Sequence, residues 1–319
     1  MLADILFAQE LQDKTGPNHK THVLMSDGEL FATDGVISYC CPVDASIHAG
    51  LHTYTLAETL KKTGDDYQII HESQDHFIIR SGKFRVKMQP LDPDLLVKIP
   101  LYGSKIDINE EVLDKLQNIE SMASKKGELV ITSSMLLTQN TALTSNRRHI
   151  IETYHGLGLD NRYVVPIQLF ATIKKLEKIC GKKPIAMHEN DKVLFLSYED
   201  KSYLACQLFD CDWPDLSNIF STPSNVQAIP EELSEAIDYL EPFSENGTLN
   251  FEQNLVQTTG QNQTNTASFE TKNCQLSGLF KVDDLRFMIR RASHYDPVGN
   301  DKSIYYYGDD VRGAIARFN

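Results

Sequence analysis

Apolar and polar residues alternate along this chain with two different periods, and the two periods follow one another in the same order three times. Segments in which apolar residues recur every three to four positions predict amphipathic helices, and segments in which they recur every second position predict strands. Each round runs through a helix, a pair of strands, a second helix and a β-hairpin. Repetition on this scale predicts tandem units of one architecture.

The three rounds predict elements with the following bounds. The first round gives Leu2–Lys14, Thr21–Phe31, Val36–Cys41, Thr55–Lys62, Tyr67–Ile70 and Phe77–Met88. The second gives Glu110–Ser124, Leu129–Thr138, Arg148–Tyr154, Pro166–Cys180 and Val193–Phe209. The third gives Glu231–Glu241, Thr248–Val256, Ala267–Thr271, Phe280–Arg291 and Ser303–Phe318. We therefore expect an α+β chain of three domains, 1–98, 99–222 and 223–319, each with two helices packed on β-sheets.

Rounds two and three contain one element that round one does not. Short segments at Lys105–Ile108 and Asn225–Ala228 predict a strand just before the first helix of each of these rounds. The first round opens directly on its helix at Leu2. We expect the corresponding sheet of the first domain to lack that strand.

The charge balance argues against a protein that grips nucleic acid by attraction. The 319 residues carry 31 Lys and Arg against 44 Asp and Glu, a net charge of −13. Proteins that bind DNA through its phosphates usually have the opposite sign, because neutralising phosphates supplies much of their affinity. Any role on DNA must therefore work without strong overall attraction.

The six cysteines and the lack of long apolar runs predict a cytoplasmic protein. No apolar run reaches the roughly 18 residues that would span a bilayer, and the first residues form an amphipathic segment rather than a signal peptide. The cysteines include no C-x-x-C pair and fall mostly inside expected helices and strands, which favours reduced, buried thiols.

The sequence offers little that would support catalysis. It contains no phosphate-binding loop, zinc-protease helix, nucleophile elbow or dinucleotide fingerprint. His48 and His52 have the spacing of a helical metal pair, but Gly50 lies between them and no third ligand is near in the sequence. We expect no metal, no cofactor and no catalytic site.

Three short motifs in their order give the chain a family resemblance. Ala32-Thr33-Asp34-Gly35 follows a strand, Ile79–Phe84 forms the hairpin of round one, and Phe209–Asp215 closes round two. Within a threefold α+β repeat, this order resembles the bacterial β sliding clamp, the processivity factor of the replicative DNA polymerase. The resemblance extends over nearly the whole chain, although no single motif is diagnostic.

The resemblance implies a ring. In the family, two three-domain subunits close head to tail around duplex DNA, with helices lining the hole and sheets outside. It implies a homodimer that holds DNA by topology without sequence preference, has no nucleotide site, and binds polymerase and clamp loader through short hydrophobic peptides. An acidic protein fits such a ring, because the ring must slide rather than grip.

Basic residues near helix ends are the expected DNA-facing positions. Cations near helix C-termini also complement the helix dipole in any protein, so only their recurrence in all three rounds favours the DNA reading. The candidates are Lys61, Lys62, Lys125, Lys126, Lys174, Lys175, Lys178, Arg286, Arg290 and Arg291.

The resemblance also implies an apolar pocket for partner peptides between the second and third domains. The matching positions here are Thr144, Asn146, Arg147, Arg148, His149, Pro214, Ile219, Ala314, Ile315 and Ala316. Ordinary packing between domains is the alternative for each of them. The run Thr144–His149 and the ending Ile315–Asn319 depart from the family pattern, so we expect a pocket of different shape. A phage or plasmid clamp that serves its own polymerase would show such drift.

Two features favour an alternative, a clamp-like protein that binds replication proteins without encircling DNA. One is the missing first strand, which in the family lies near the subunit contact. The other is the first helix of round three, which has no Lys or Arg and would repel phosphate if it faced the hole. Its acidic residues are Glu231, Glu232, Glu235, Asp238 and Glu241.

Overall fold

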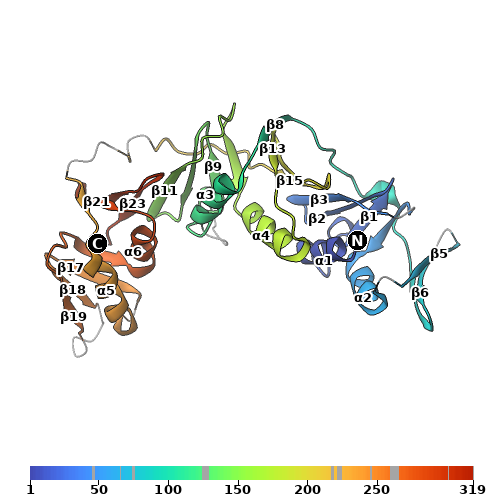
Figure 1. Ribbon diagram of the computed structural model, residues 1–319, viewed down its shortest axis with the longest axis horizontal. Helices are drawn as coiled ribbons and strands as arrows, with labels where there is room; N and C mark the ends of the chain where they lie inside the picture. The colour runs from blue at the N-terminus through green and yellow to red at the C-terminus, as the bar shows by residue number, and fades with distance from the viewer. Residues whose placement is uncertain are drawn as a thin grey trace. The chain divides into compact units, whose positions relative to one another are not determined.

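The computed structural model describes most of the chain, and its residues form two compact units. The described residues are 1–44, 47–64, 66–73, 76–123, 129–216, 219–220, 225–244, 246–258, 266–300 and 302–318. The first unit contains Met1–Leu113 and Tyr163–Asp210, and the second contains Asp114–Arg162 and Cys211–Asn319. Figure 1 shows the elements in chain order.

The first unit is built on one large antiparallel sheet. Its strands, in spatial order, are β4 (Ala49–His52), β1 (His22–Ser26), β2 (Glu29–Thr33), β3 (Ile37–Pro42), β15 (Tyr203–Gln207), β14 (Val193–Ser197), β13 (Ala186–Glu189) and β8 (Ser104–Asp107). Two sets of four strands meet where β3 pairs with β15, with Cys40 opposite Tyr203 and Ile37 opposite Cys206. Segments far apart in the sequence therefore share one continuous sheet.

A smaller sheet and three helices complete the first unit. The sheet consists of β5 (Gln68–Ser73), β6 (His76–Ser81) and β7 (Phe84–Met88), and the helices are α1 (Leu2–Leu11), α2 (Thr53–Thr63) and α4 (Gln168–Cys180). Strand β12 (Tyr163–Pro166) leads into α4, and short 3-10 turns lie at η1 (Asn18–Lys20) and η2 (Pro93–Leu95). Helix α1 contacts α2, α4 and the strands β2 and β3, so these helices cover one face of the large sheet (Figure 1).

The second unit repeats this plan. The strands of this unit in its large antiparallel sheet are, in spatial order, β9 (Ser134–Leu137), β10 (Thr141–Ser145), β11 (His149–Tyr154), β23 (Val311–Ala316), β22 (Ser303–Tyr307), β21 (His294–Asn300) and β16 (Gln227–Ala228). The smaller sheet has the order β19 (Ser268–Glu270), β18 (Leu255–Thr258), β17 (Thr248–Glu252) and β20 (Ser277–Lys281). The helices are α5 (Glu231–Leu240) and α6 (Val282–Ile289), with turns η3 (Val130–Ser133) and η4 (Glu241–Phe243). Helix α3 (Glu110–Glu120) crosses the boundary between the two units.

The strand orders show an internal repeat. The order β4-β1-β2-β3 in the first unit corresponds, element by element, to β20-β17-β18-β19 in the second. Likewise β8-β13-β14-β15 corresponds to β16-β21-β22-β23. The contact of β3 with β15 thus has an equivalent in that of β11 with β23, where His149 lies opposite Ile315. Strand orders thus repeat within the chain, whereas the division into three domains and the bounds 1–98, 99–222 and 223–319 stay a prediction.

Several element bounds differ from those that periodicity predicts. The expected strand Thr21–Phe31 is two strands, because Asp27 and Gly28 both have positive φ and turn the chain back on itself. Thr248–Val256 is divided in the same way at Gln253 and Asn254. The helix expected to reach Lys14 ends at Leu11.

A polar cluster, buried at Asp4 and Tyr39 and exposed at Asp200, ties the N-terminus to the core of the first unit. Lys182 pairs with Asp4 at 2.6 Å and with Asp200 at 2.8 Å, and the Tyr39 hydroxyl donates to Asp4 at 2.7 Å. Burial raises the pKa of Asp4, but the bonds from Lys182 and Tyr39 outweigh it and leave the pKa below its usual value. The six cysteines form no disulfide.

Candidate partner-binding pocket and DNA-facing helices

A pocket of about 180 Å³ lies on one face of the large sheet in the second unit. We call it the peptide pocket. Its lining residues are Ile131, Ser145, Arg147, Arg148, His149, Ile150, Trp213, Pro214, Leu216, Ile219, Ser303, Ala314 and Ala316. Strands β10, β11, β22 and β23 supply the floor, and Trp213, Pro214, Leu216 and Ile219 supply a wall.

On β10 and β23, strand alternation decides which residues line the peptide pocket. Side chains along a strand point to opposite faces in turn, so Ala314 and Ala316 line the pocket while Ile315 between them is fully buried away from it. Thr144 is also fully buried, and its hydroxyl donates to the Ile119 carbonyl at 3.0 Å. Its neighbour Ser145 lines the pocket instead.

The pocket gathers most of the positions expected from the sequence and adds others. Arg147, Arg148, His149, Pro214, Ile219, Ala314 and Ala316 lie together in it, and Thr144, Asn146 and Ile315 do not line it. Asn146 shapes the turn beside it, because its side-chain oxygen accepts from the backbone N–H groups of Arg148 and His149. The lining residues that sequence reasoning missed are Ile131, Ser145, Ile150, Trp213, Leu216 and Ser303.

A buried hydrogen-bonded network supports the pocket from below. The two ring nitrogens of His149 contact Tyr306 Oη at 2.6 Å and Asp284 Oδ1 at 3.3 Å. Burial lowers the pKa of His149 below its usual value, and the Asp284 carboxylate only partly offsets this effect. His149 is therefore neutral at pH 7 and holds β11 against α6 as an uncharged link.

The rim of the pocket is cationic and aromatic. Arg147 and Arg148 are exposed, and the Arg148 guanidinium lies 4.3 Å from the centre of the Phe318 ring. The indole nitrogen of Trp213 is buried without a hydrogen-bond partner among the described residues. An apolar floor of alanine and isoleucine within a polar rim suits a short hydrophobic peptide.

Solved structures with the same fold are bacterial sliding clamps. No family model and no curated protein matches the sequence. The DNA polymerase sliding clamp of Bacillus subtilis aligns with a TM-score of 0.81 at 14% identity, over 100% of this chain and 96% of that one. The Helicobacter pylori β clamp bound to a DNA ligase peptide aligns at 0.80 and 14%, over 100% and 97%. The DNA polymerase III β subunit of Pseudomonas aeruginosa aligns at 0.78 and 15%, also over 100% and 97%.

The chain has the β-clamp fold. In this clamp fold, the expected DNA-facing lysines of the first unit lie on α2 and α4. Lys61, Lys62, Lys174, Lys175 and Lys178 are all exposed. Lys61 pairs with Glu58 of its own helix at 2.7 Å. Lys125 and Lys126 lie outside the described residues.

Two of the three expected DNA-facing arginines, Arg286 and Arg291, have partners within the second unit. Arg286 on α6 pairs with Asp238 and Glu241, which belong to α5 and the turn after it. Arg291 is partly buried, donates to the Asn118 carbonyl at 2.8 Å and stacks 3.8 Å from the centre of the Phe287 ring. Arg290 is exposed.

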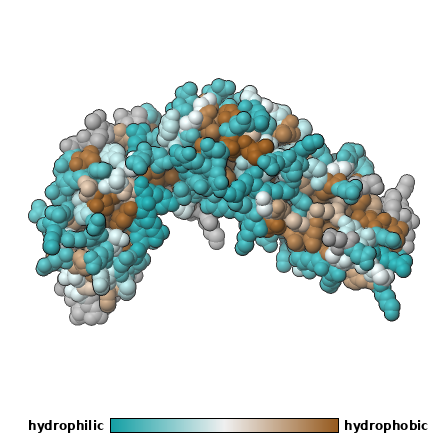
Figure 2. Space-filling view, in the orientation of Figure 1, coloured by the Kyte–Doolittle hydropathy of each residue, from teal (hydrophilic) through white to brown (hydrophobic). Residues whose placement is uncertain are grey.

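Part of the acidic surface of α5 is thus matched by α6. Asp238 and Glu241 neutralise Arg286, whereas Glu231 and Glu235 are exposed on the same helix. Figure 2 shows that hydrophilic residues cover most of the face in view and that apolar residues gather in separate patches.

The described residues were also compared with the requirements of a metal site and of a membrane-spanning helix. Among these residues, no cluster of His, Cys, Asp and Glu could hold a metal ion, and no helix is long and apolar enough to cross a bilayer. His52 instead caps α2 by accepting from the Thr55 backbone N–H, and His48 shares a hydrogen bond with Ser26.

Proposed function

We propose that this protein is a DNA sliding clamp without catalytic activity of its own. Two copies close into a ring around duplex DNA, and the peptide pocket tethers a polymerase and other replication proteins. The observation that carries the proposal is the pair of strand edges that the internal repeat leaves without a partner among the described residues.

The repeat identifies these edges. Strands β3 and β11 pair with β15 and β23, which are the last strands of the sets β8-β13-β14-β15 and β16-β21-β22-β23. In the sheet β20-β17-β18-β19, the strand that corresponds to β3 and β11 is β19. In the three-stranded sheet β5-β6-β7, the strand that corresponds to β15 and β23 is β7, the last strand along the chain. Within the described residues, β19 and β7 are sheet edges. An antiparallel β7–β19 contact between two copies would repeat the joint already made twice in each chain.

The chemistry of the two edges is complementary. Strand β7 alternates Phe84, Val86 and Met88 with the exposed cations Arg85 and Lys87. Strand β19 places the partly buried Phe269 between the exposed residues Ser268 and Glu270. Opposite charges and apolar side chains facing each other across strands stabilise a sheet. Because a free edge is open to pairing with another chain, a head-to-tail dimer would also protect both edges.

The charge distribution supports a topological hold on DNA. A net charge of −13 leaves little long-range attraction for phosphate. The exposed lysines of α2 and α4 supply local positive charge on helices, while the sheets carry the subunit joints. A ring with weak local contacts can slide, because no single phosphate contact is strong enough to stop it.

The peptide pocket supports the tethering role. A related fold, the Helicobacter pylori β clamp, has been solved with a DNA ligase peptide bound. In this chain, Ala314, Ala316, Ile150 and Ile219 offer an apolar floor and wall of a size that accepts one or two side chains.

A clamp-like protein that does not encircle DNA is the second candidate. The exposed carboxylates Glu231 and Glu235 on α5 favour it, since a helix lining the hole would bring them near phosphate.

Loading on circular DNA separates the two candidates. The protein is loaded onto a nicked plasmid with a clamp loader, and the plasmid is then cut once. A topological clamp is lost on linearisation and is retained when both ends are blocked, whereas an ordinary binder remains in both cases. Retention on unblocked linear DNA would refute encirclement.

A further inference from the structure

Three sets of strands correspond to one another in the internal repeat, and one set differs from the other two. The set β8-β13-β14-β15 has β8 before α3 and its other three strands after α4. The set β16-β21-β22-β23 has β16 before α5 and its other three strands after α6. Strands β5, β6 and β7 follow α2 in the same way, but no strand among the described residues lies beside β5 in the position of β8 and β16.

Strand β5 pairs with β6 in the register in which β13 pairs with β14. In both pairs a histidine lies opposite a phenylalanine, His71 opposite Phe77 and His188 opposite Phe195. The residue before each histidine therefore holds the same place in its sheet. These residues are Ile70 in β5 and Met187 in β13.

Two backbone hydrogen bonds extend this equivalence to β21. The N–H of Ile108 donates to the carbonyl two residues before Met187, and the N–H of Ile229 donates to the carbonyl two residues before Tyr295. Tyr295 of β21 thus holds the place of Met187 and Ile70.

Exposure at this place follows the presence of the neighbouring strand. Met187 lies opposite Ile106 of β8 and is 3% exposed, and Tyr295 lies opposite Gln227 of β16 and is 0% exposed. Ile70, which has no strand on that side among the described residues, is 40% exposed. A large apolar side chain holds this place in all three sheets, and only in β5 does it face solvent.

The backbone of β5 is open along the same side. Strand β5 pairs with β6 alone (Figure 1), so the N–H and C=O groups on its other side have no strand partner among the described residues. Gln68–His71 keep a regular register with β6, and an irregularity follows before Ser73. We call this side of Gln68–His71 the open edge of β5. The opposite edge of the sheet is β7, which the proposed ring pairs with β19, so the open edge stays accessible in the ring.

We propose that the open edge of β5 accepts an extended segment of a partner protein as a fourth strand. The segment runs antiparallel to β5, as β8 runs beside β13 and β16 beside β21. It bonds to the backbone of β5 and covers Ile70 with an apolar side chain. This inference goes beyond the proposed function and does not depend on the peptide pocket.

The filled edge of β13 defines the chemistry of the segment. Strand β8 directs the partly buried Ile106 and the following Ile108 toward the sheet, with the exposed Asp107 between them. We therefore expect apolar residues at alternate positions and polar residues between them. A second copy is the less suitable occupant, because each ring has two open edges and their pairing would link rings into open chains.

A strand supplied within the chain tests the open edge. The Tyr67 hydroxyl donates to Met1 Sδ at 3.5 Å, so the start of α1 lies beside the residue before β5. Asn109 holds the corresponding position before α3. We insert Ser-Lys-Ile-Asp-Ile, the sequence of residues 104–108, directly before Met1. Hydrogen exchange of the amides in 68–71, followed by mass spectrometry, should become about tenfold slower.

An insert that cannot pair is the control for this variant. Ser-Pro-Asp-Pro-Asp has the same length, lacks two backbone donors and offers no apolar side chain. Exchange in 68–71 should stay at the rate of the parent. Equal exchange with both inserts would overturn the open edge as a place for a strand.

Peptide selection tests the partner segment. A library of random eight-residue peptides is panned against the full chain carrying Ser303→Trp, which fills the peptide pocket. Fluorescence anisotropy then measures the selected peptides. We expect alternating apolar residues, about tenfold weaker binding to Ile70→Lys, and no binding to the chain that carries the inserted strand.

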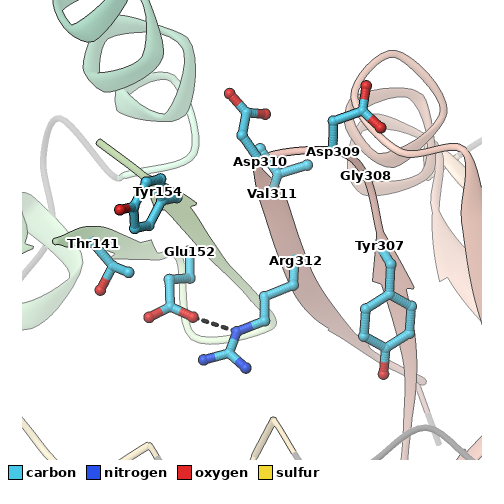
Figure 3. Close-up of a pocket in the computed structure, with 9 residues that line it drawn as sticks. All are labelled: Thr141, Glu152, Tyr154, Tyr307, Gly308, Asp309, Asp310, Val311 and Arg312. Atoms are coloured by element: carbon cyan, nitrogen blue, oxygen red, sulfur yellow. Dashed lines mark hydrogen bonds and ion pairs between the residues drawn. The ribbon is translucent and has the colours of Figure 1, made fainter. Parts of the chain in front are cut away.

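Tyr154→Lys is the matched control for Ile70→Lys. Tyr154 is exposed on β11, which has β10 and β23 as neighbours, and Figure 3 shows it near the pair that Glu152 forms with Arg312 of β23. Binding to this variant should match that of the parent. A selection that yields no peptide sensitive to Ile70→Lys would overturn the partner segment. Assemblies larger than two chains in sedimentation velocity, lost in Ile70→Lys, would also overturn it and assign the open edge to a second copy.

Discussion

At the scale of residues, the site depends on which face of a strand each side chain occupies. The family resemblance located the segments around His149 and Ala314, but consecutive residues of a strand cannot all face one pocket. A strict period of two would have excluded Ile315 and included Ser145. Trp213 carried no comparable signal, because it lies outside any helix or strand and no periodicity describes it.

His149 makes the folding stability of the protein depend on pH. Its imidazole is fully buried, and its pKa is lowered mainly by burial. The unfolded chain therefore takes up a proton near pH 6.5 while the folded chain does not. This residue's contribution to folding is intact above that pH and is lost as the pH falls below it.

Replacing His149 should change both the stability and its pH dependence. We expect His149→Gln to lower the free energy of unfolding at pH 8 by about 1–3 kcal/mol, since Tyr306 and Asp284 lose a buried partner. The loss of stability between pH 7 and pH 5.5 should be smaller in the variant than in the parent. Urea unfolding at the two pH values measures both effects. An equal pH dependence in parent and variant would show that folding does not lower the pKa of His149.

At the scale of elements, hydrophobic periodicity located all six helices in the described residues but not all strands. Strands β4, β10, β12, β13, β20 and β21 were not expected. Of these, β4, β12 and β20 are four or five residues long and lie just before a helix. In such short segments the alternation of a strand cannot be told from the first turn of an apolar helix stripe. The acidic helix α5 could be found from its sequence, but its pairing with Arg286 of α6 could not.

Helix α4 is the best test of the DNA-facing positions. Replacing Lys174, Lys175 and Lys178 together with alanine removes three exposed cations from one helix. We expect unchanged folding and less efficient loading onto circular DNA, with the difference growing as salt is lowered because these contacts are electrostatic.

A variant with the same change in charge serves as the control. Lys105, Lys192 and Lys272 are exposed and lie on a strand edge or in turns, so their replacement with alanine should leave loading near that of the parent. Equal loss of loading in both variants would show that net charge alone sets it, and no loss in either would remove α4 from the DNA-facing surface.

At the scale of the whole molecule, the sequence shows that a unit is repeated but not how the repeats join. The strand pairs β3–β15 and β11–β23 join strands that are far apart in the chain. No sequence motif in either strand of a pair indicates which strand it pairs with. Only the structure reveals that the same joint is made twice. That regularity in turn singles out β7 and β19 for pairing between copies.

Charge reversal on β7 and β19 tests the proposed ring, and mixing the two variants tests whether the dimer can be restored. In one variant Arg85 and Lys87 on β7 become Glu, and in the other Ser268 and Glu270 on β19 become Lys. Each variant alone would place like charges across both joints, which destabilises paired strands. We expect each to have a mass near the 36.1 kDa chain at micromolar concentration, and the parent to have about twice that mass.

Mixing the two variants should restore the dimer. In the mixed ring, one joint pairs the acidic β7 with the basic β19, and the other pairs the two unaltered edges, so both joints regain opposite charges. Sedimentation velocity distinguishes a mixed dimer from two monomers, and a tag on one variant identifies its composition. Dimers that persist in both single variants would place the subunit contact elsewhere. If neither variant dimerises and mixing restores nothing, the β7–β19 joint is refuted as an interface set by these charges.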